Sequence, residues 1–281
     1  MKLREKIALK YIRTKFQVLS LVSKRKTAEQ AFKLFCTPFI KSSSRARTIF
    51  ESAEMLHFKL NGLNIQGYRW NKNNPHKVLI LHGFGSAAYN FNSYIIAMLE
   101  KGYQVLAFDA PAHGNSQGHT LNAMEYSQMI TQVIHLYGPV NGFIAHSFGG
   151  IALSLAMEKT AHDEHTKIVF IAPATETTTS IDSAFKLLQI DDEEIRIEFD
   201  RIIFEKSGYH PRWFSIKRAM KNIKASVLWI HDEEDDITPL ADALKVKEAG
   251  FLNIEFVITK GLGHRKIYRD AAIQKKISEF L

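Results

Sequence analysis

Cysteine is almost absent from this sequence of 281 residues, which contains only Cys36. A single thiol excludes an internal disulfide and a metal site built from several cysteines. Its apolar setting, Leu34–Pro38, favours a buried small hydrophobic side chain over a reactive thiol. A chain without disulfides fits a reducing compartment, so we expect a cytoplasmic protein.

Long apolar runs and cofactor motifs are missing as well. The longest uncharged run near the N-terminus is Phe16–Ser23, which is too short to span a membrane and has no small-residue cleavage site of a secretory signal. The sequence contains no glycine-rich dinucleotide or phosphate-loop pattern and no metal ligands at a useful spacing. We therefore expect neither a cofactor nor a bound metal.

Positive charge is concentrated at one end of the chain. Residues 1–54 contain 13 Lys/Arg and 4 Asp/Glu, whereas residues 55–281 contain 24 and 25, so the net charges are +9 and −1. A nucleic-acid-binding core should carry clustered cations, so we expect no nucleic-acid partner. Residues 1–54 have the pattern of a basic amphipathic helical arm. We favour packing of this arm on the body with its lysines in solvent, and weak peripheral contact with an anionic membrane is the alternative.

The remainder of the chain alternates short apolar runs with helical stretches. Strands buried on both faces read as continuous apolar runs, and their alternation with helices indicates crossovers in a parallel sheet. A hairpin signal, Asn61-Gly62, precedes the first run. The predicted class is therefore α/β, with a mostly parallel doubly wound sheet. The expected strands of this sheet are Val78–Leu81, Val105–Phe108, Phe143–Ala145, Ile168–Ile171, Val227–Ile230 and Ile254–Ile258.

The alternation stops at residues 175–224, which read as charged helices without a buried strand. A helical insertion between strands is most simply a cap over their carboxyl ends, where ligands bind in such sheets. The expected organisation is an arm at 1–54, a core at 55–174 and 225–281, and a cap (lid) at 175–224. Apolar cap residues, including Trp213, either favour a hydrophobic substrate group or hold the cap helices together. The sequence does not indicate an oligomeric state.

Ser147 lies where an apolar run meets a helical pattern, in Gly142–Gly150. A serine at a tight strand-to-helix turn, with small residues two positions before and after it, is typical of a nucleophile elbow. Ala145 and Gly149 occupy those positions, and glycine is usual at both, so the match is near. The motif indicates a catalytic serine only if an acid and a base follow it in the chain in that order.

An acid and a base do follow, each after a predicted strand. In the elbow architecture the order is Ser, Asp/Glu, His. Residues 232–236 are five consecutive acidic residues, so spacing alone leaves the acid open. His264, on a glycine-rich loop after the next strand, is the expected base. His113 precedes the serine and is interpreted as a loop-ordering residue near the site. His146 is adjacent to the serine in sequence, but its side chain should leave the elbow on the other side of the chain. We therefore do not expect His146 to be the base.

From about residue 55 to the end, the chain resembles the α/β-hydrolase superfamily. His231–Pro239 is similar to the acid loop of that family, and this resemblance implies Asp235 as the acid, with Asp236 as the alternative. Asp232 stands where the family has glycine. The other segments that carry the resemblance are the His-Gly loop Leu81–Ser86, Phe108–Ser116, Ala145–Gly149 and Gly263-His264.

The resemblance implies a serine hydrolase, and we expect a carboxylesterase that cleaves small or medium acyl esters through an acyl-enzyme on Ser147. Asp235 would orient His264, and the backbone amides of Phe84 and Phe148 would form the oxyanion hole. A carbon–carbon bond hydrolase, a thioesterase and a non-catalytic binding protein of the same fold remain open. A non-catalytic binding protein would be favoured if His264 lay far from Ser147. The expected substrate-binding residues are His82, Gly83, His113 and Trp213.

Overall fold

The computed structural model describes residues 3–38 and 48–281. The chain forms two compact units: a helical unit of residues 3–37 and 176–214, and a sheet unit of residues 48–175 and 215–281. Residues 1–2 and 39–47 of the expected arm lie outside the described residues. The N-terminal helices and the helices expected to form the cap thus belong to the same unit.

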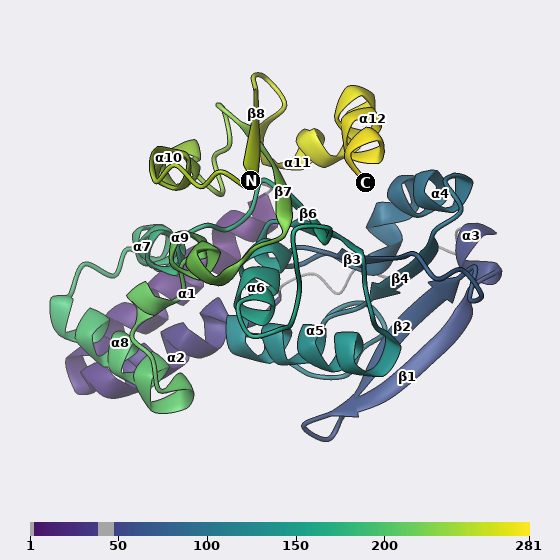
Figure 1. Ribbon diagram of the computed structural model, residues 1–281. Coiled ribbons are helices and arrows are strands. Elements are labelled where there is room, and N and C mark those ends of the chain that lie inside the picture. Colours follow the sequence, from purple (N-terminus) through teal and green to yellow (C-terminus); the bar gives the residue numbers. More distant parts are fainter. Residues whose placement is uncertain (1–2, 39–47) are drawn as a thin grey trace. The chain divides into compact units, whose positions relative to one another are not determined.

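The sheet unit is built on one eight-stranded sheet with the order β1-β2-β4-β3-β5-β6-β7-β8 (Figure 1). Strands β1 (Glu54–Leu60) and β2 (Leu63–Trp70) form the expected antiparallel hairpin, and Asn61 and Gly62 both adopt the positive φ that its two-residue turn requires. The other six strands pair with one another in parallel, as predicted, and β4 also pairs antiparallel with β2. They are β3 (Lys77–Leu81), β4 (Gln104–Phe108), β5 (Gly142–His146), β6 (Lys167–Ile171), β7 (Ser226–Asp232) and β8 (Ile254–Thr259).

Helices cover both faces of the sheet (Figure 1). Alternate strand residues such as Val78 and Ile80 form one core with Tyr94 of α4 (Asn92–Glu100) and Ile277 of α12 (Ala271–Phe280). The opposite face is covered by α5 (Ala123–Tyr137) and α6 (Phe148–Met157). Shorter elements complete the unit: α3 (Thr48–Glu51), η1 (Ala88–Phe91), α9 (Ile216–Ala219), η3 (Met220–Asn222), α10 (Leu240–Glu248), α11 (Gly263–Lys266) and η4 (Ile267–Arg269).

The C-terminal helix begins later than its apolar pattern suggests. Residues 267–281 read as one helix, but Asp270 adopts an extended backbone and its side chain accepts hydrogen bonds from the amides of Ala272 and Ile273. An N-cap of this kind starts a new helix. α12 is therefore separate from the short helices that precede it.

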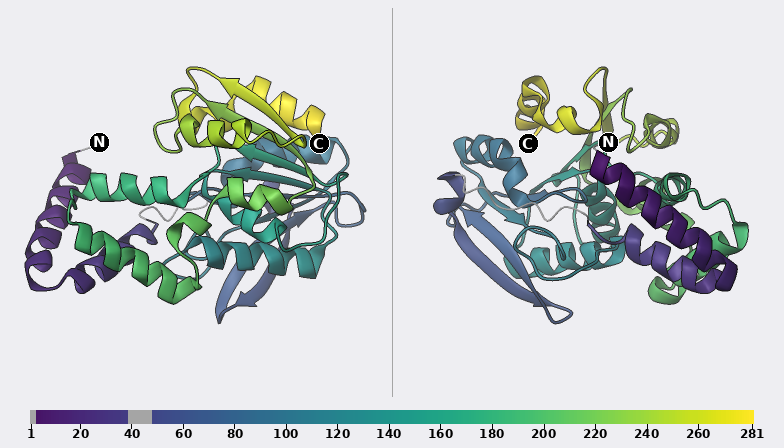
Figure 2. Two further views of the ribbon diagram at one scale, coloured as in Figure 1. Left: turned by 60° about the vertical axis from the view of Figure 1, so that its left-hand side comes forward. Right: turned by 180° about the vertical axis from the view of Figure 1, so that it is seen from behind.

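The helical unit consists of α1 (Leu3–Val22), α2 (Lys24–Phe35), α7 (Thr177–Leu188), α8 (Glu193–Ser207) and η2 (Pro211–Trp213). Figure 2 shows α1 and α2 in purple and α7 and α8 in green. Phe199 of α8 lies at the centre, with edge-to-face ring contacts to Phe32, Phe35 and Phe185. Cys36 is buried, as expected. These contacts show that apolar residues of 176–214 hold helices together. No helix in the described parts of the chain has the length and apolar character needed to cross a bilayer.

Candidate active site

Ser147 forms the turn between β5 and α6 with φ 54° and ψ −120°, a positive-φ conformation that residues other than glycine seldom adopt. Its amide donates to the carbonyl of Ile171 (3.1 Å), and its carbonyl accepts from the amides of Gly150 (2.9 Å) and Ala174 (3.0 Å). Such strain persists only where the surroundings fix the backbone. These three hydrogen bonds hold Ser147 at the end of its strand.

Close packing around the turn explains which small residues it needs. A Cβ atom at Gly149 would lie 2.8 Å from the carbonyl oxygen of His82 and 3.0 Å from that of Leu81, so glycine is required there. At Gly83 a Cβ would lie 2.9 Å from the Cβ of Ser147. Ala145, by contrast, fits its methyl group into a fully buried position. The departure from the usual glycine at position 145 is therefore accommodated.

The structure brings Ser147, His264 and Asp235 together. The Nε2 atom of His264 lies 3.0 Å from the Ser147 Oγ, and its Nδ1 lies 2.8 Å from the Asp235 Oδ2. Asp235 follows β7 and His264 lies on α11, after β8. All three residues are buried. Asp236, the alternative acid, is exposed and makes no such contact with His264 among the described hydrogen bonds.

Asp235 is held by its own loop. Its Oδ1 accepts the amides of Ile237 (2.9 Å) and Thr238 (2.8 Å), and the Thr238 hydroxyl lies 2.9 Å from its Oδ2. Burial raises the pKa of Asp235, but the hydrogen bond and charge of His264 and the two amides outweigh burial and lower it below its ordinary value. Sequence reasoning missed Thr238, although Asp-X-X-Thr is a spacing at which a carboxylate caps a turn.

The rings of His82 and His113 are both engaged by backbone. The Nε2 of His82 accepts from the amide of Ala110 (2.9 Å), and its Nδ1 donates to the Gly83 carbonyl (2.8 Å). The Nε2 of His113 accepts from the amide of Gly85 (2.9 Å), and its Nδ1 donates to the Pro111 carbonyl (2.9 Å). Both nitrogens of each ring are thus engaged, and the two rings order loops around the elbow. Contact of either ring with a substrate stays a prediction.

His146 packs beside the site without bonding to the nucleophile's oxygen. Its ring centre lies 4.5 Å from that of Tyr268 and 4.9 Å from that of His264, and its Nε2 lies 3.3 Å from the His264 carbonyl oxygen. Burial lowers the pKa of His146 to about 3. A neutral ring therefore supports the His264 segment.

Two phenyl rings lie next to the elbow. Phe84 and Phe148 meet edge to face at 5.5 Å, and the Phe84 side chain is 37% exposed. Phe148 is the first residue of α6, where a backbone N–H has no partner within the helix. Trp213, the remaining expected substrate-binding residue, lies in the helical unit and stacks on Tyr209 with ring centres 3.9 Å apart.

Comparison with known proteins identifies the family of this chain. A model of the "Alpha/beta hydrolase family" matches residues 78–242. The chain belongs to the alpha/beta hydrolase family. It is 23% identical over 250 residues to "Uncharacterized protein YqkD" of Bacillus subtilis, a match that covers 83% of this chain and 79% of that protein. It is also 29% identical over 107 residues to "Uncharacterized hydrolase YugF" of the same organism, across 36% of this chain and 39% of that protein.

Solved structures share the fold. The Pyrococcus furiosus esterase Pf2001 aligns with a TM-score of 0.65 and 15% sequence identity, covering 87% of this chain and 98% of that chain. A structure of Est1E from Butyrivibrio proteoclasticus with bound ferulic acid aligns with a TM-score of 0.61 and 16% identity, over 80% of this chain and 97% of that chain. The mostly parallel sheet predicted from the sequence is thus confirmed as an alpha/beta hydrolase fold.

Asp232, which departs from the glycine of the family motif, connects the acid loop to the base loop. Its Oδ1 accepts from the amides of Glu234 (3.0 Å) and Gly263 (2.9 Å), and its Oδ2 accepts from the Leu262 amide (3.1 Å) and the Thr259 hydroxyl (2.6 Å). Burial raises the pKa of Asp232, but these four donors together lower it below its usual value. An ionised carboxylate therefore fixes the segment that carries the predicted base.

Replacing Asp232 by asparagine should destabilise the sheet unit. Every orientation of the amide places its NH2 group against at least one backbone N–H that the carboxylate now accepts. Leaving a buried donor without its acceptor costs about 1–3 kcal/mol in the free energy of unfolding. Urea unfolding measures this loss, and the exposed neighbour Asp236→Asn is the matched control, with an expected change within about 0.5 kcal/mol. Equal losses in both variants would contradict this role.

Three buried imidazoles should make the protein sensitive to acid. Burial lowers the pKa of His82 and His113 to about 4 and that of His146 to about 3. In the unfolded chain these rings protonate near pH ~6.5, so protons favour unfolding as the pH falls from there toward the folded values. Each ring then reduces the free energy of unfolding by about 1.4 kcal/mol per pH unit. Urea unfolding between neutral pH and pH ~5 measures the slope.

His146→Phe removes one of these groups and keeps a planar ring between its aromatic neighbours. Its slope should be shallower by about 1.4 kcal/mol per pH unit. The exposed His57→Gln is the matched control and should leave the slope unchanged. If the two variants show the same slope as the parent protein, burial of His146 does not govern acid stability.

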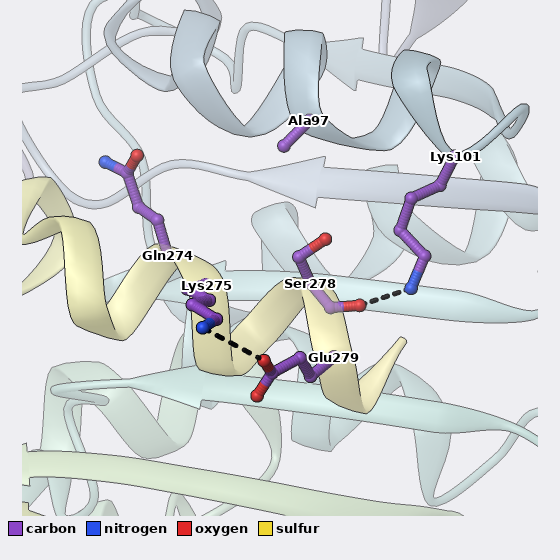
Figure 3. A pocket seen from close by; sticks show the side chains of 6 residues that line it. All are labelled: Ala97, Lys101, Gln274, Lys275, Ser278 and Glu279. Carbon is purple, nitrogen blue, oxygen red and sulfur yellow. Dashed lines mark hydrogen bonds and ion pairs between the residues drawn. The ribbon is translucent and has the colours of Figure 1, made fainter.

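A pocket of about 320 Å³ lies elsewhere on the sheet unit, between α4 and α12 (Figure 3). It contains none of the predicted site residues. Its Lys101 binds the Ser278 carbonyl and its Lys275 pairs with Glu279 (3.8 Å), so the cations drawn there are already engaged. Across residues 3–38 and 48–281, no group of three or more His, Cys, Asp or Glu side chains is arranged to hold a metal ion.

Proposed function

We propose that this protein is a serine carboxylesterase that cleaves small or medium acyl esters. The observation that supports this most directly is the chain of contacts from Ser147 through His264 to Asp235, at 3.0 Å and 2.8 Å. A serine hydroxyl needs a base to accept its proton, and the base needs a partner that fixes its orientation. Membership of a hydrolase family agrees with this chemistry.

Acylation would begin at the Ser147 hydroxyl. As its Oγ bonds to the ester carbonyl carbon, the proton passes to the Nε2 of His264, and the carbonyl electron pair moves onto oxygen. Asp235 accepts the Nδ1–H and stabilises the imidazolium. The amides of Phe84 and Phe148 are the proposed donors to the oxyanion. When the carbonyl reforms, the alkoxy group leaves with the proton from His264, and the acyl group remains on Ser147.

Deacylation would repeat these steps with water. His264 takes a proton from a water molecule whose oxygen bonds to the acyl carbon, and the second oxyanion uses the same two amides. Collapse returns the proton to Ser147 Oγ and releases the carboxylic acid. The base is thus restored at the end of each turnover.

The substrate class is proposed from the surface beside the nucleophile. The rings of Phe84 and Phe148 contact each other, and Phe84 remains over one third exposed. Apolar side chains that keep contact with solvent favour an apolar acyl group through the hydrophobic effect. Short and medium acyl chains supply this contact without requiring a long channel.

A fluorophosphonate probe tests the nucleophile, and a panel of nitrophenyl esters from acetyl to dodecanoyl tests the substrate class. We expect labelling on the peptide that contains Ser147, located by mass spectrometry, and highest turnover with short or medium chains. Thioester analogues run in parallel separate an esterase from a thioesterase. Absence of both labelling and turnover would refute the proposal and favour a non-catalytic binding protein.

A further inference from the structure

One face of α1 exposes a stripe of large apolar side chains, with the exposed Thr14 among them. The opposite face packs into the helical unit, where Phe16 is buried and Ile12 and Leu19 are partly buried. With about 3.6 residues per turn, the spacings of three, four and seven residues along the stripe place its members on one side of the helix. The stripe consists of Ile7 (61% exposed), Tyr11 (71%), Val18 (60%), Leu21 (88%) and Val22 (76%).

Positive charge borders this stripe on both sides. By helical position, Lys10 flanks one edge and Lys15 the other, and both residues are exposed. Residues 7–22 contain no aspartate or glutamate. Arg13, which points away from the stripe by helical position, donates to the Leu187 carbonyl (2.8 Å) and thereby ties α1 to α7. The stripe is therefore presented by a helix that is anchored to its own unit.

The charge distribution around the stripe distinguishes between the partners that could bind it. A second copy of α1 packed on this stripe would bring lysines against lysines, with no acidic side chain in residues 7–22 to pair with them. An anionic lipid surface complements both features, because its headgroups attract the lysines and its acyl boundary accepts the apolar side chains.

We propose that α1 binds the surface of anionic membranes, lying in the interface with its stripe toward the acyl chains. The occupant is a bilayer that contains acidic phospholipids. The lysines bring the helix to the surface, and Leu21 and Val22, the most exposed members of the stripe, insert at one end. This interaction is independent of the proposed chemistry at Ser147, since it uses residues of the helical unit alone.

Vesicle flotation with the full chain tests the proposal. One set of vesicles contains phosphatidylcholine with phosphatidylserine, and the other contains phosphatidylcholine only. The stripe variant is Leu21→Ser/Val22→Ser, and its matched control is Leu136→Ser/Leu252→Ser, which removes two exposed apolar side chains elsewhere. Circular dichroism verifies that each variant keeps its helix content, and sedimentation analysis of the same samples reports the oligomeric state.

A charge variant tests the contribution of the lysines that border the stripe. Lys10→Gln/Lys15→Gln removes the bordering cations, and Lys59→Gln/Lys221→Gln removes two exposed lysines of the sheet unit. Each bordering lysine should contribute roughly fivefold to partitioning onto anionic vesicles. Added salt should weaken binding of the parent protein, because it screens the attraction between the lysines and the lipid headgroups.

We expect binding to the anionic vesicles only, a loss on the order of tenfold in the stripe variant, and unchanged binding in both controls. Equal binding to neutral vesicles, or equal losses in variants and controls, would overturn the proposal. So would a parent protein that does not float but forms a dimer that Leu21→Ser/Val22→Ser dissociates, since the occupant would then be a second copy of the chain.

Discussion

Replacing Ser147 by alanine should lower kcat for ester hydrolysis by roughly 10⁶-fold and abolish labelling by a fluorophosphonate. The hydroxyl is the only atom group removed, and its Oγ lies 3.0 Å from the Nε2 of His264. Without it no acyl-enzyme forms, and any remaining rate comes from binding and the oxyanion donors alone. Burst and steady-state assays with a short-chain nitrophenyl ester measure the loss.

A second substitution at the same position separates chemistry from backbone strain. Ser147→Gly should be equally inactive, but it should raise the free energy of unfolding by about 1 kcal/mol relative to Ser147→Ala, because glycine adopts φ 54° without steric cost. Ser154→Ala, a serine of α6 whose hydroxyl donates to the nearby Ile151 carbonyl, is the activity control. Full activity in Ser147→Ala would rule out Ser147 as the nucleophile.

The sheet could be predicted because its signals are local. Each buried parallel strand is a short apolar run, such as Val78–Leu81 within β3, and the hairpin follows from the backbone preferences of Asn61 and Gly62. Parallel strands have their carboxyl ends at the same edge of the sheet, so the residues that follow them were expected to meet there. This is why Ser147 and His264 could be assigned to one site although 117 positions separate them.

The remaining features depend on contacts that the local sequence does not encode. The choice between Asp235 and Asp236 needed the family motif, because both belong to the same acidic run, and burial distinguishes them only after folding. Asp232 looked like a departure from that motif until its four hydrogen bonds placed it between two loops. The grouping of residues 3–37 with 176–214 likewise rests on packing between distant segments.

Replacing Asp235 by asparagine should lower kcat by roughly 10⁴-fold while the protein stays folded. The amides of Ile237 and Thr238 both donate to the Oδ1 of Asp235, so they will select the orientation in which the asparagine oxygen occupies that place. The asparagine NH2 then takes the position of Oδ2, 2.8 Å from the Nδ1 of His264. An NH2 group donates, so the Nδ1 of His264 must accept.

The consequence is a reversed tautomer. With Nδ1 as acceptor, the proton of neutral His264 resides on Nε2, which faces the Ser147 Oγ and can no longer take its proton. The defect therefore falls on kcat, whereas KM, which depends on contacts elsewhere, should change little. Asp236→Asn removes the same charge from the adjacent exposed residue and should retain full kcat. A comparable loss in Asp236→Asn would attribute the effect to the net charge of the acidic loop, because only the Asp235 substitution reverses the hydrogen bond to His264.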